Sequence, residues 1–528
     1  MSFLRRPFKS RGSEDSVDAN SGHESDVTDG SLHYVVEKGG NNSGPSCQEA
    51  TGAPVETSSP LGYAVGPVTI VFLNVSKMIG TGVYSTPSAI LKGTGSVGLS
   101  MIYWALGFLT SIASFSVYLE FASYFPNRSG SEVVYLEQAY PRPKWLFPTA
   151  VAFQSVALSF SSGNAIVLSQ YLFKVAGSTP GPWQLKGVAV AGYTVATLAT
   201  AYGLTNALYR IIFSYAGFEN AFNVVNEVKN PVKQIRKYGW ISLGIVTVLY
   251  ILANIAYFAA VPKADLTAAE QIAASLFFAN VFGSSGAVRG LNFLIALSSF
   301  GNLLTVLIGS SRMLRECGRQ GVLPYPRFWA STRPFGTTLG PYLVKYILTI
   351  IMIVAPPAGD AFNFIADLQV YPSAFFGFVM SVGLYVVRWR RSRLNLPPPE
   401  FKAWDVIIIF NIAKDLYLLI MPWYPPEGGV FAGDVSFWYA TYVVAGIGIL
   451  LGCGVYYWLW IYVVPKARGY RIRQQVLELA DGAQSHKLVK VPVGDLAEWD
   501  ATHDHVGRPL QQVPSVPGSE EEKKPAAV

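Results

Sequence analysis

Two glycines separated by one residue, Gly80 and Gly82, interrupt an apolar run near residues 67–91 that is long enough to cross a bilayer. Glycine costs about 1 kcal/mol relative to alanine inside a helix, so we expect the helix to open here. The backbone groups that it releases are tolerated in hydrocarbon only where they line a cavity or bind a ligand. The sequence therefore predicts a binding site near the membrane midplane, at which backbone N–H groups after Ile79, those of Gly80, Thr81 and Gly82, hold a carboxylate. The alternative is a close contact between helices, which small residues also allow.

A second interrupted span, at 214–219, strengthens this prediction, because a single Gly-X-Gly sequence is weak evidence. Glu219, Asn223 and Glu227 follow at intervals of four residues, so they lie on one face of a helix. Ten residues separate Glu219 from Lys229, which corresponds to about 15 Å of helix and places Glu219 near the middle of the hydrocarbon core. At that depth we expect the carboxyl group to face the protein interior, either as a proton relay or as a structural, hydrogen-bonded acid.

Lys77 is a further candidate, because it lies three residues before Gly80 in the same apolar run. A lysine at this depth is costly if it faces lipid. Its ammonium group is expected either to take the place of a coupling cation or to extend toward the membrane surface. Polar residues of the third and seventh runs either face the same cavity or join neighbouring helices by hydrogen bonds, namely Gln154, Ser162, Asn164, Ser298, Ser299 and Asn302.

The composition indicates a polytopic membrane protein. Hydrophobic residues make up 51% of the 528 residues and charged residues only 14%, whereas soluble domains carry about 25% charged residues. The net charge of +7 comes from basic residues in short loops, so it indicates topology and not nucleic-acid binding. The three cysteines are far apart and the five histidines lie in the terminal segments. We therefore expect no disulfide framework, metal site, cofactor or enzymatic centre.

The chain divides into three parts. Residues 1–62 are polar and are expected to form a disordered cytosolic tail, with no cleavable signal peptide. Residues 63–465 are expected to form the transmembrane domain, and residues 466–528, which are charged and contain proline, a second cytosolic tail. Eleven apolar runs lie near residues 67–91, 98–124, 145–176, 185–202, 204–227, 238–261, 287–311, 340–355, 361–387, 404–424 and 436–464.

Basic residues in the loops predict the side of the membrane that each loop faces. Clusters follow the second, fifth, seventh, ninth and eleventh runs, and the positive-inside rule places them in the cytosol. The fourth run should also end in the cytosol near Tyr202, yet the fifth begins at Leu204 with almost no loop. Two consecutive runs cannot both end inside unless a span lies between them. Either a helix is missing near residues 200–206 or the stretch 185–227 folds irregularly, and we expect the first.

Three sequence motifs carry a resemblance to a known family: Met78-Ile79-Gly80-Thr81-Gly82, Phe213-Ser214-Tyr215-Ala216-Gly217-Phe218-Glu219-Asn220 and Glu227-Val228-Lys229-Asn230-Pro231. Further matching residues are Tyr118, Glu120, Pro126, Ser129, Gly130, Tyr135, Arg312 and the segments 299–301 and 319–324. Over residues 63–465 the chain resembles the amino acid–polyamine–organocation superfamily and, within it, the L-type amino acid transporters. More narrowly, it is similar to the fungal high-affinity methionine permeases.

The resemblance implies an all-α membrane fold of twelve helices in an inverted repeat, with the first and sixth helices unwound at the substrate. Eleven spans are visible here, and the fifth helix of the family is absent, since residues 199–202 run almost directly into the sixth. In this interpretation the carbonyl groups of the sixth helix bind the ammonium group of the substrate and Phe218 covers its side chain. The residues that open are Phe213, Ser214, Tyr215, Ala216 and Gly217.

The function that the resemblance implies is secondary active transport of neutral L-amino acids, with methionine as the expected substrate. Glu219 and Lys77 are the candidates for proton coupling in such a symporter of the plasma membrane. Ubiquitin or arrestin-type proteins are the expected regulators of the tails. The alternative is a non-transporting nutrient sensor, or an inactive splice or gene-model variant, because the tails are long and a helix is absent. No Walker motif is present, which argues against an ATP-driven pump.

Overall fold

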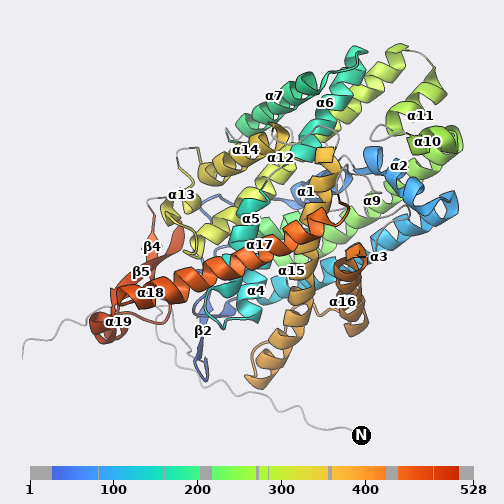
Figure 1. Ribbon diagram of the computed structural model, residues 1–528. Helices are drawn as coiled ribbons and strands as arrows, with labels where there is room; N and C mark the ends of the chain where they lie inside the picture. Colours follow the sequence, from blue (N-terminus) through green and yellow to red (C-terminus); the bar gives the residue numbers. More distant parts are fainter. Residues whose placement is uncertain are drawn as a thin grey trace, which may run out of the picture.

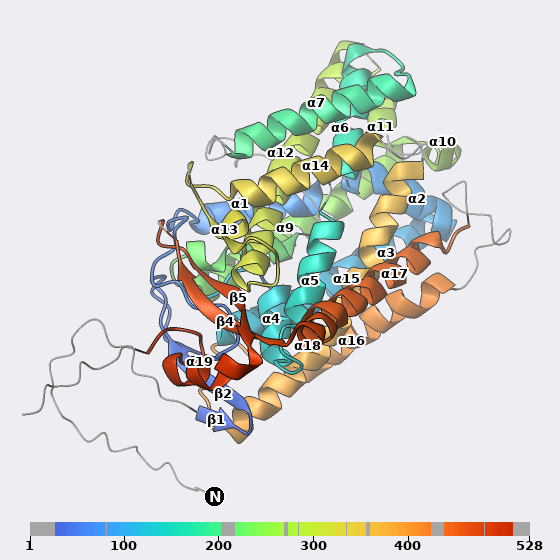
Figure 2. The same ribbon diagram turned by 60° about the vertical axis from the view of Figure 1, so that its left-hand side comes forward.

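Long helices packed side by side form the body of the molecule, and two small sheets lie together at one end of it (Figures 1 and 2). The computed structural model describes residues 27–80, 82–159, 161–201, 217–268, 273–283, 285–333, 335–354, 360–423, 438–479 and 481–510. Within these residues, seven helices are long and apolar enough to cross a membrane, and two shorter apolar helices accompany them. The expectation of an all-α polytopic membrane protein is confirmed.

The helices of the first half of the chain are α1 (Pro67–Ile79), α2 (Gly82–Thr94), α3 (Val97–Tyr124), α4 (Glu132–Ala139), α5 (Leu146–Ala157), α6 (Ser162–Ala176), α7 (Pro182–Ala201), the 3₁₀ helix η1 (Phe218–Glu227) and α9 (Pro231–Ala260). Those of the second half are α10 (Lys263–Ala268), α11 (Ala273–Phe282), α12 (Ser285–Arg319), α13 (Pro326–Ala330), α14 (Leu339–Val354), α15 (Asp360–Arg393), α16 (Asp405–Ile420), η2 (Met421–Trp423), α17 (Thr441–Trp458), η3 (Leu459–Val463), α18 (Val464–Arg468), η4 (Val493–Asp495) and α19 (Leu496–Thr502). We call the end of the bundle that carries Lys233, Arg312, Arg388 and Lys466 the basic end.

The predicted break in the first span is present. Helix α1 ends at Ile79, Gly80 has φ +35° and ψ −130°, and α2 begins at Gly82. A positive φ of this kind is open to glycine at little cost and strained for other residues, so the break follows from the residue type. In the second predicted break, residues 213–216 lie outside the described part of the chain. From Phe218 the chain forms the 3₁₀ helix η1, which has a kink at Val224.

The stretch 185–227 was expected either to lack a helix or to fold irregularly, and both alternatives stay predictions. Helix α7 is continuous from Pro182 to Ala201, and it is not among the seven long apolar spans of the described residues. Residues 202–216, where the missing helix is expected, lie outside the described part of the chain. The expected number of eleven spans is therefore not tested here.

The composition predicts disorder for residues 1–62, but residues 27–62 are folded. Strands β1 (Val27–Asp29), β2 (Leu32–Glu37) and β3 (Ser46–Glu49) form an antiparallel sheet, in which Tyr34 pairs with Val27 and with Glu49. The composition rule counts only the apolar surface that a segment can bury by itself. This segment instead buries polar groups against the bundle, as Gln48 and Glu56 show, with 1% and 5% exposure.

The C-terminal segment is also folded where the structure describes it. Strands β4 (Tyr470–Glu478) and β5 (Gln484–Pro492) form an antiparallel hairpin, and α19 follows it. Figures 1 and 2 show this hairpin beside α13, at the same end of the bundle as the N-terminal sheet. Gln474 of β4 donates a hydrogen bond to the carbonyl of Ala50, so the two terminal segments contact each other.

Candidate substrate site

The two interrupted segments meet at Lys77 and Gly217. A β-carbon placed on Gly217 would lie 2.5 Å from the β-carbon of Lys77 and 2.7 Å from its carbonyl carbon. Any side chain at position 217 would therefore push the two segments apart. The glycine just before η1 is explained by this close approach to the last turn of α1.

Lys77 and Glu219 form an ion pair across this contact. The Nζ atom of Lys77 lies 2.6 Å from Oε1 of Glu219, and the two side chains are 18% and 20% exposed. The pairing gives the ammonium group of Lys77 a partly buried carboxylate partner, and the two roles expected for Lys77 stay predictions. Pairing leaves two charges in the bilayer interior with no net charge, which lowers the cost of holding each of them there.

Side chains of two other helices stabilise the broken end of α1. In a continuous helix the carbonyls of Ser76 and Met78 would accept hydrogen bonds from the N–H groups of Gly80 and Gly82. Here Asn302 of α12 donates its amide to the carbonyls of Ser76 (3.0 Å) and Lys77 (3.3 Å), and the hydroxyl of Tyr250 of α9 donates to that of Met78. Because side chains of other helices donate to these carbonyls, the break does not leave them as buried polar groups without a hydrogen bond.

A cavity of about 240 Å³ lies beside the ion pair, and both Lys77 and Glu219 line it. Its polar lining residues are Lys77, Tyr118, Glu132, Gln154, Ser155, Ser159, Glu219, Ser310, Lys345 and Ser373. Gln154 was expected to face such a cavity, and it does. Asn164 and Asn302, in contrast, bond to each other at 2.6 Å, which is the helix-joining role.

Lys345 is the residue of this cavity that sequence reasoning missed. It lies on α14, is 2% exposed, and forms no ion pair in the part of the chain that the structure describes. A lysine within the apolar run 340–355 was the available signal. The cavity therefore contains two ammonium groups and the carboxylates of Glu219 and Glu132, the second of which accepts hydrogen bonds from Tyr118 and Ser131.

None of the predicted substrate residues that the structure describes lines this cavity. Ile79 is 4% exposed and belongs to the core, and Gly80 and Gly82 flank the break. Phe218 packs edge-to-face against Phe115 and Tyr118, with ring centroids 6.1 and 5.5 Å apart. Thr81, Phe213, Ser214, Tyr215 and Ala216 lie outside the described residues.

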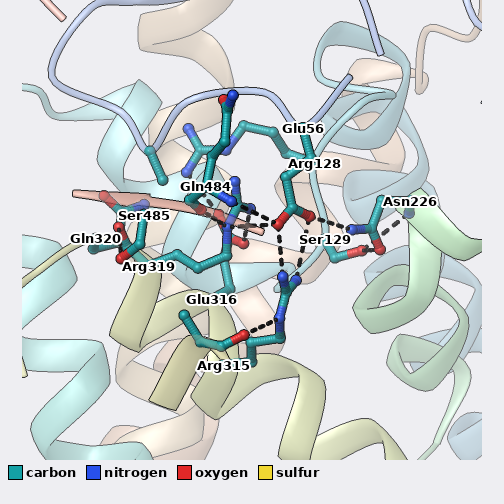
Figure 3. A network of polar contacts seen from close by, with 12 residues as sticks. Glu56, Arg128, Ser129, Asn226, Arg315, Glu316, Arg319, Gln320, Gln484 and Ser485 are labelled. Atoms are coloured by element: carbon teal, nitrogen blue, oxygen red, sulfur yellow. Dashed lines mark hydrogen bonds and ion pairs between the residues drawn. The ribbon is translucent and has the colours of Figure 1, made fainter. Parts of the chain in front are cut away.

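A network of buried ion pairs and hydrogen bonds joins the basic end of the bundle to both terminal segments (Figure 3), and Arg319 donates to the carbonyl of Gln484 in the C-terminal hairpin. The guanidinium of Arg128 contacts Glu137 at 3.1 Å and Glu316 at 3.0 Å. Arg319 contacts Glu316 at 2.6 Å, and Arg315 contacts Glu56 of the N-terminal segment at 2.6 Å. Asn226 of η1 joins the network, because its side-chain amide donates to Glu56.

Two titratable groups at this end are shifted by burial. Burial raises the pKa of Glu137 to about 7, although the charge of Arg128 opposes this. His486 of β5 is 0% exposed, and burial, with the nearby charges of Arg128 and Arg319, lowers the pKa of its ring to about 3. The docked hairpin therefore holds a neutral histidine.

Comparison with known proteins decides the family. A family model described as amino acid permease matches residues 65–205 and 192–450. The chain belongs to the amino acid permease family. It is thus a transporter and not an enzyme. The two matched stretches overlap at residues 192–205, where the loop charges indicate a missing span.

Individual relatives of this permease agree. It is 30% identical to the high-affinity methionine permease of Saccharomyces cerevisiae, over 84% of this chain and 87% of the relative. It is 25% identical to the low-affinity methionine permease of the same yeast, over 88% and 96%. It is also 24% identical to the human cystine/glutamate transporter, over 65% and 78%.

Proposed function

We propose that this amino acid permease is a proton-coupled symporter of neutral L-amino acids, with methionine as its main substrate. The observation that carries the proposal is the broken first span with Gly217 and Lys77 in contact beneath it. The similarity to two methionine permeases supports the choice of substrate. We further propose a plasma-membrane location with both terminal segments in the cytosol, because basic clusters gather at the end of the bundle where these segments lie.

In this proposal the two broken segments divide the recognition of the substrate. N–H groups at Gly80, Thr81 and Gly82 hold the carboxylate, because the start of a helix offers free donors and a positive dipole end. Carbonyls of the segment 213–217 hold the ammonium group, and Phe218 covers the side chain. The aromatic surroundings of Phe218 suit a thioether, which makes favourable contacts with rings.

The ion pair of Lys77 and Glu219 supplies the coupling. A proton on Glu219 removes the negative charge that holds Lys77 at 2.6 Å. The released ammonium group then attracts the carboxylate of a substrate bound at the nearby break. Protonation and substrate binding thereby favour each other, as thermodynamic linkage requires for symport.

Uptake of labelled methionine tests this function. Cells without methionine uptake of their own should gain saturable uptake, which increases as the external pH falls, when they express the chain. Normal surface expression without uptake would contradict the proposal. It would favour the second candidate, a non-transporting nutrient sensor or an inactive variant. Two observations support this candidate: the loop charges, and the overlap of the two family matches at residues 192–205. Sequencing of the transcript across codons 199–206 shows whether a span has been lost.

A further inference from the structure

A second cavity, of about 470 Å³, lies at the basic end and shares no lining residue with the cavity beside Lys77 and Glu219. Three helix ends form one side of it: Tyr124 ends α3, Lys233 lies in the first turn of α9, and Arg391 lies in the last turn of α15. The N-terminal segment forms the other side through residues 42–47. Because α3, α9 and the second part of α15 are long and apolar enough to cross a membrane, the cavity lies at the ends of three candidate spans.

Arg391 brings a buried positive charge to this cavity. Its side chain is 8% exposed, and its guanidinium lies 4.7 Å from the ring centre of Tyr124. Its terminal nitrogens donate to the carbonyls of Cys47 (3.1 Å) and Pro397 (3.3 Å), while Nε has no hydrogen-bond partner. In the described residues no carboxylate pairs with it. Neutral carbonyls satisfy donors but do not balance a buried charge, so the charge of Arg391 favours an anionic ligand at this cavity.

The start of α9 points to the same ligand. This helix has 30 residues and begins after Asn230, whose side chain makes no capping hydrogen bond. Its first N–H groups have no partner within the helix, and the dipole makes this end positive. Val232 and Lys233 of its first turn line the cavity. An uncapped helix start and a lysine together form a site suited to phosphate.

The remaining walls fit a phosphate group that is attached to an apolar body. The loop 42–46 adds the polar groups of Asn42 and Ser43, while Val27, Val36 and Leu396 are apolar. The exposed Glu400 also lines the cavity and is its one carboxylate in the described residues. The two basic residues therefore leave a net positive charge.

We propose that this cavity binds the phosphate headgroup of an anionic phospholipid from the membrane leaflet at the basic end. The position at the ends of three spans brings lipid headgroups to the cavity, and the basic residues of this end attract anionic lipids. Since the N-terminal segment forms one wall, a bound headgroup also holds that segment on the bundle. The inference goes beyond the transport function and does not depend on it.

Thermal unfolding of the purified full chain in detergent, with and without dioctanoyl phosphatidic acid, tests the proposal. The zwitterionic dioctanoyl phosphatidylcholine and inorganic phosphate are the comparison ligands. We expect phosphatidic acid to raise the unfolding temperature of the parent, and its half-saturating concentration to rise at least about tenfold in Lys233→Glu and Arg391→Gln, since a charge-assisted hydrogen bond is worth about 1.5–3 kcal/mol. Lys233 is exposed, so its variant carries the test even if Arg391→Gln fails to fold.

Arg236→Glu is the matched control, because Arg236 is exposed on the same helix, does not line the cavity, and changes the net charge by the same amount. Parent-like binding in Arg236→Glu together with weak binding in Lys233→Glu supports the proposal. Parent-like binding in Lys233→Glu, or equal loss in both variants, overturns it. If inorganic phosphate stabilises the parent as strongly as phosphatidic acid does, the lipid as ligand is overturned in favour of free phosphate.

Discussion

The ammonium group of Lys77 lies 2.6 Å from a carboxylate oxygen of Glu219, although 142 residues separate them in the chain. The two residues come from the two segments that the sequence predicts to be interrupted. Their pairing joins the candidate carboxylate site at the break to the candidate proton carrier.

Replacement of Glu219 by glutamine tests the coupling. A neutral amide cannot gain or lose a proton, so uptake by Glu219→Gln should lose its dependence on external pH, while exchange of labelled methionine across the membrane continues. Glu400→Gln, at an exposed carboxylate far from the pair in the sequence, is the control. A pH profile of Glu219→Gln that matches the parent would assign Glu219 a structural role.

Replacement of Gly80 by leucine tests the carboxylate site. Gly80 has φ +35°, and a side chain there would also block the approach of a carboxylate to the backbone. The loss of two charge-assisted hydrogen bonds, at about 1.5–3 kcal/mol each, predicts a fall in uptake of about 100-fold or more at a normal surface level. Gly107→Leu, on α3 with no atom within 4 Å of the added β-carbon, should transport normally. Equal uptake by both variants would exclude the break as the site.

Glu56 should hold the N-terminal segment on the bundle. It contacts Arg315 at 2.6 Å and Arg319 at 3.5 Å, and all three side chains are buried. Removal of one partner from a buried ion pair costs about 3–5 kcal/mol. The N-terminal segment of Glu56→Gln should therefore detach more often, and trypsin should cleave at the exposed Lys38 much faster than in the parent. Glu498→Gln, at an exposed position of α19, should cleave at the parental rate. Unchanged cleavage in Glu56→Gln would show that other contacts dominate.

Acidification should loosen the C-terminal hairpin through His486. Docking lowers the pKa of its ring to about 3, against about 6.5 when the ring is in water. The neutral ring favours the docked state, so its contribution is complete above about pH 6.5 and falls by about 1.4 kcal/mol per pH unit below that value. The groups that face the ring are Arg128, Arg319 and Arg508. Protease accessibility of the hairpin should therefore rise about fivefold from pH 6.5 to 5.5.

His486→Gln should remove this part of the pH dependence. His503→Gln, in the same segment and only half-buried, should keep it. An identical pH dependence in the parent and in His486→Gln would contradict the role of this ring.

Both terminal segments should lie on one side of the membrane. Cysteines introduced at Lys38 and Glu498, which are exposed, should both resist a membrane-impermeant thiol reagent in intact cells and react after permeabilisation. The native Cys47, Cys317 and Cys453 are buried, so background labelling is low. Labelling of one segment alone in intact cells would mean that the two segments lie on opposite sides of the membrane. Irregular folding of the stretch 185–227 would then not explain why two consecutive runs are both predicted to end in the cytosol.

The amino-acid sequence by itself determined the features that depend on neighbouring residues. Runs of about 20 apolar residues predict spans whatever their partners are, and glycine at position 80 allows the positive φ that opens the first of them. The depth of Glu219 near the membrane midplane stays a prediction, because it was counted along an α-helix, whereas η1 is a 3₁₀ helix with a kink at Val224. Family membership followed from motifs of the same local kind.

The tertiary structure alone decided which charges meet. Lys77 pairs with Glu219 because Gly217 lets the two segments touch, and Lys345 enters the cavity because α14 packs beside it. The N-terminal segment is folded, against the prediction from its composition, since Arg315 on α12 supplies the partner for Glu56. Such contacts join residues more than a hundred positions apart. The free energy of these ion pairs depends on how the helices cross and on how much water the packing excludes. Neither can be predicted from the pattern of neighbouring residues in the sequence.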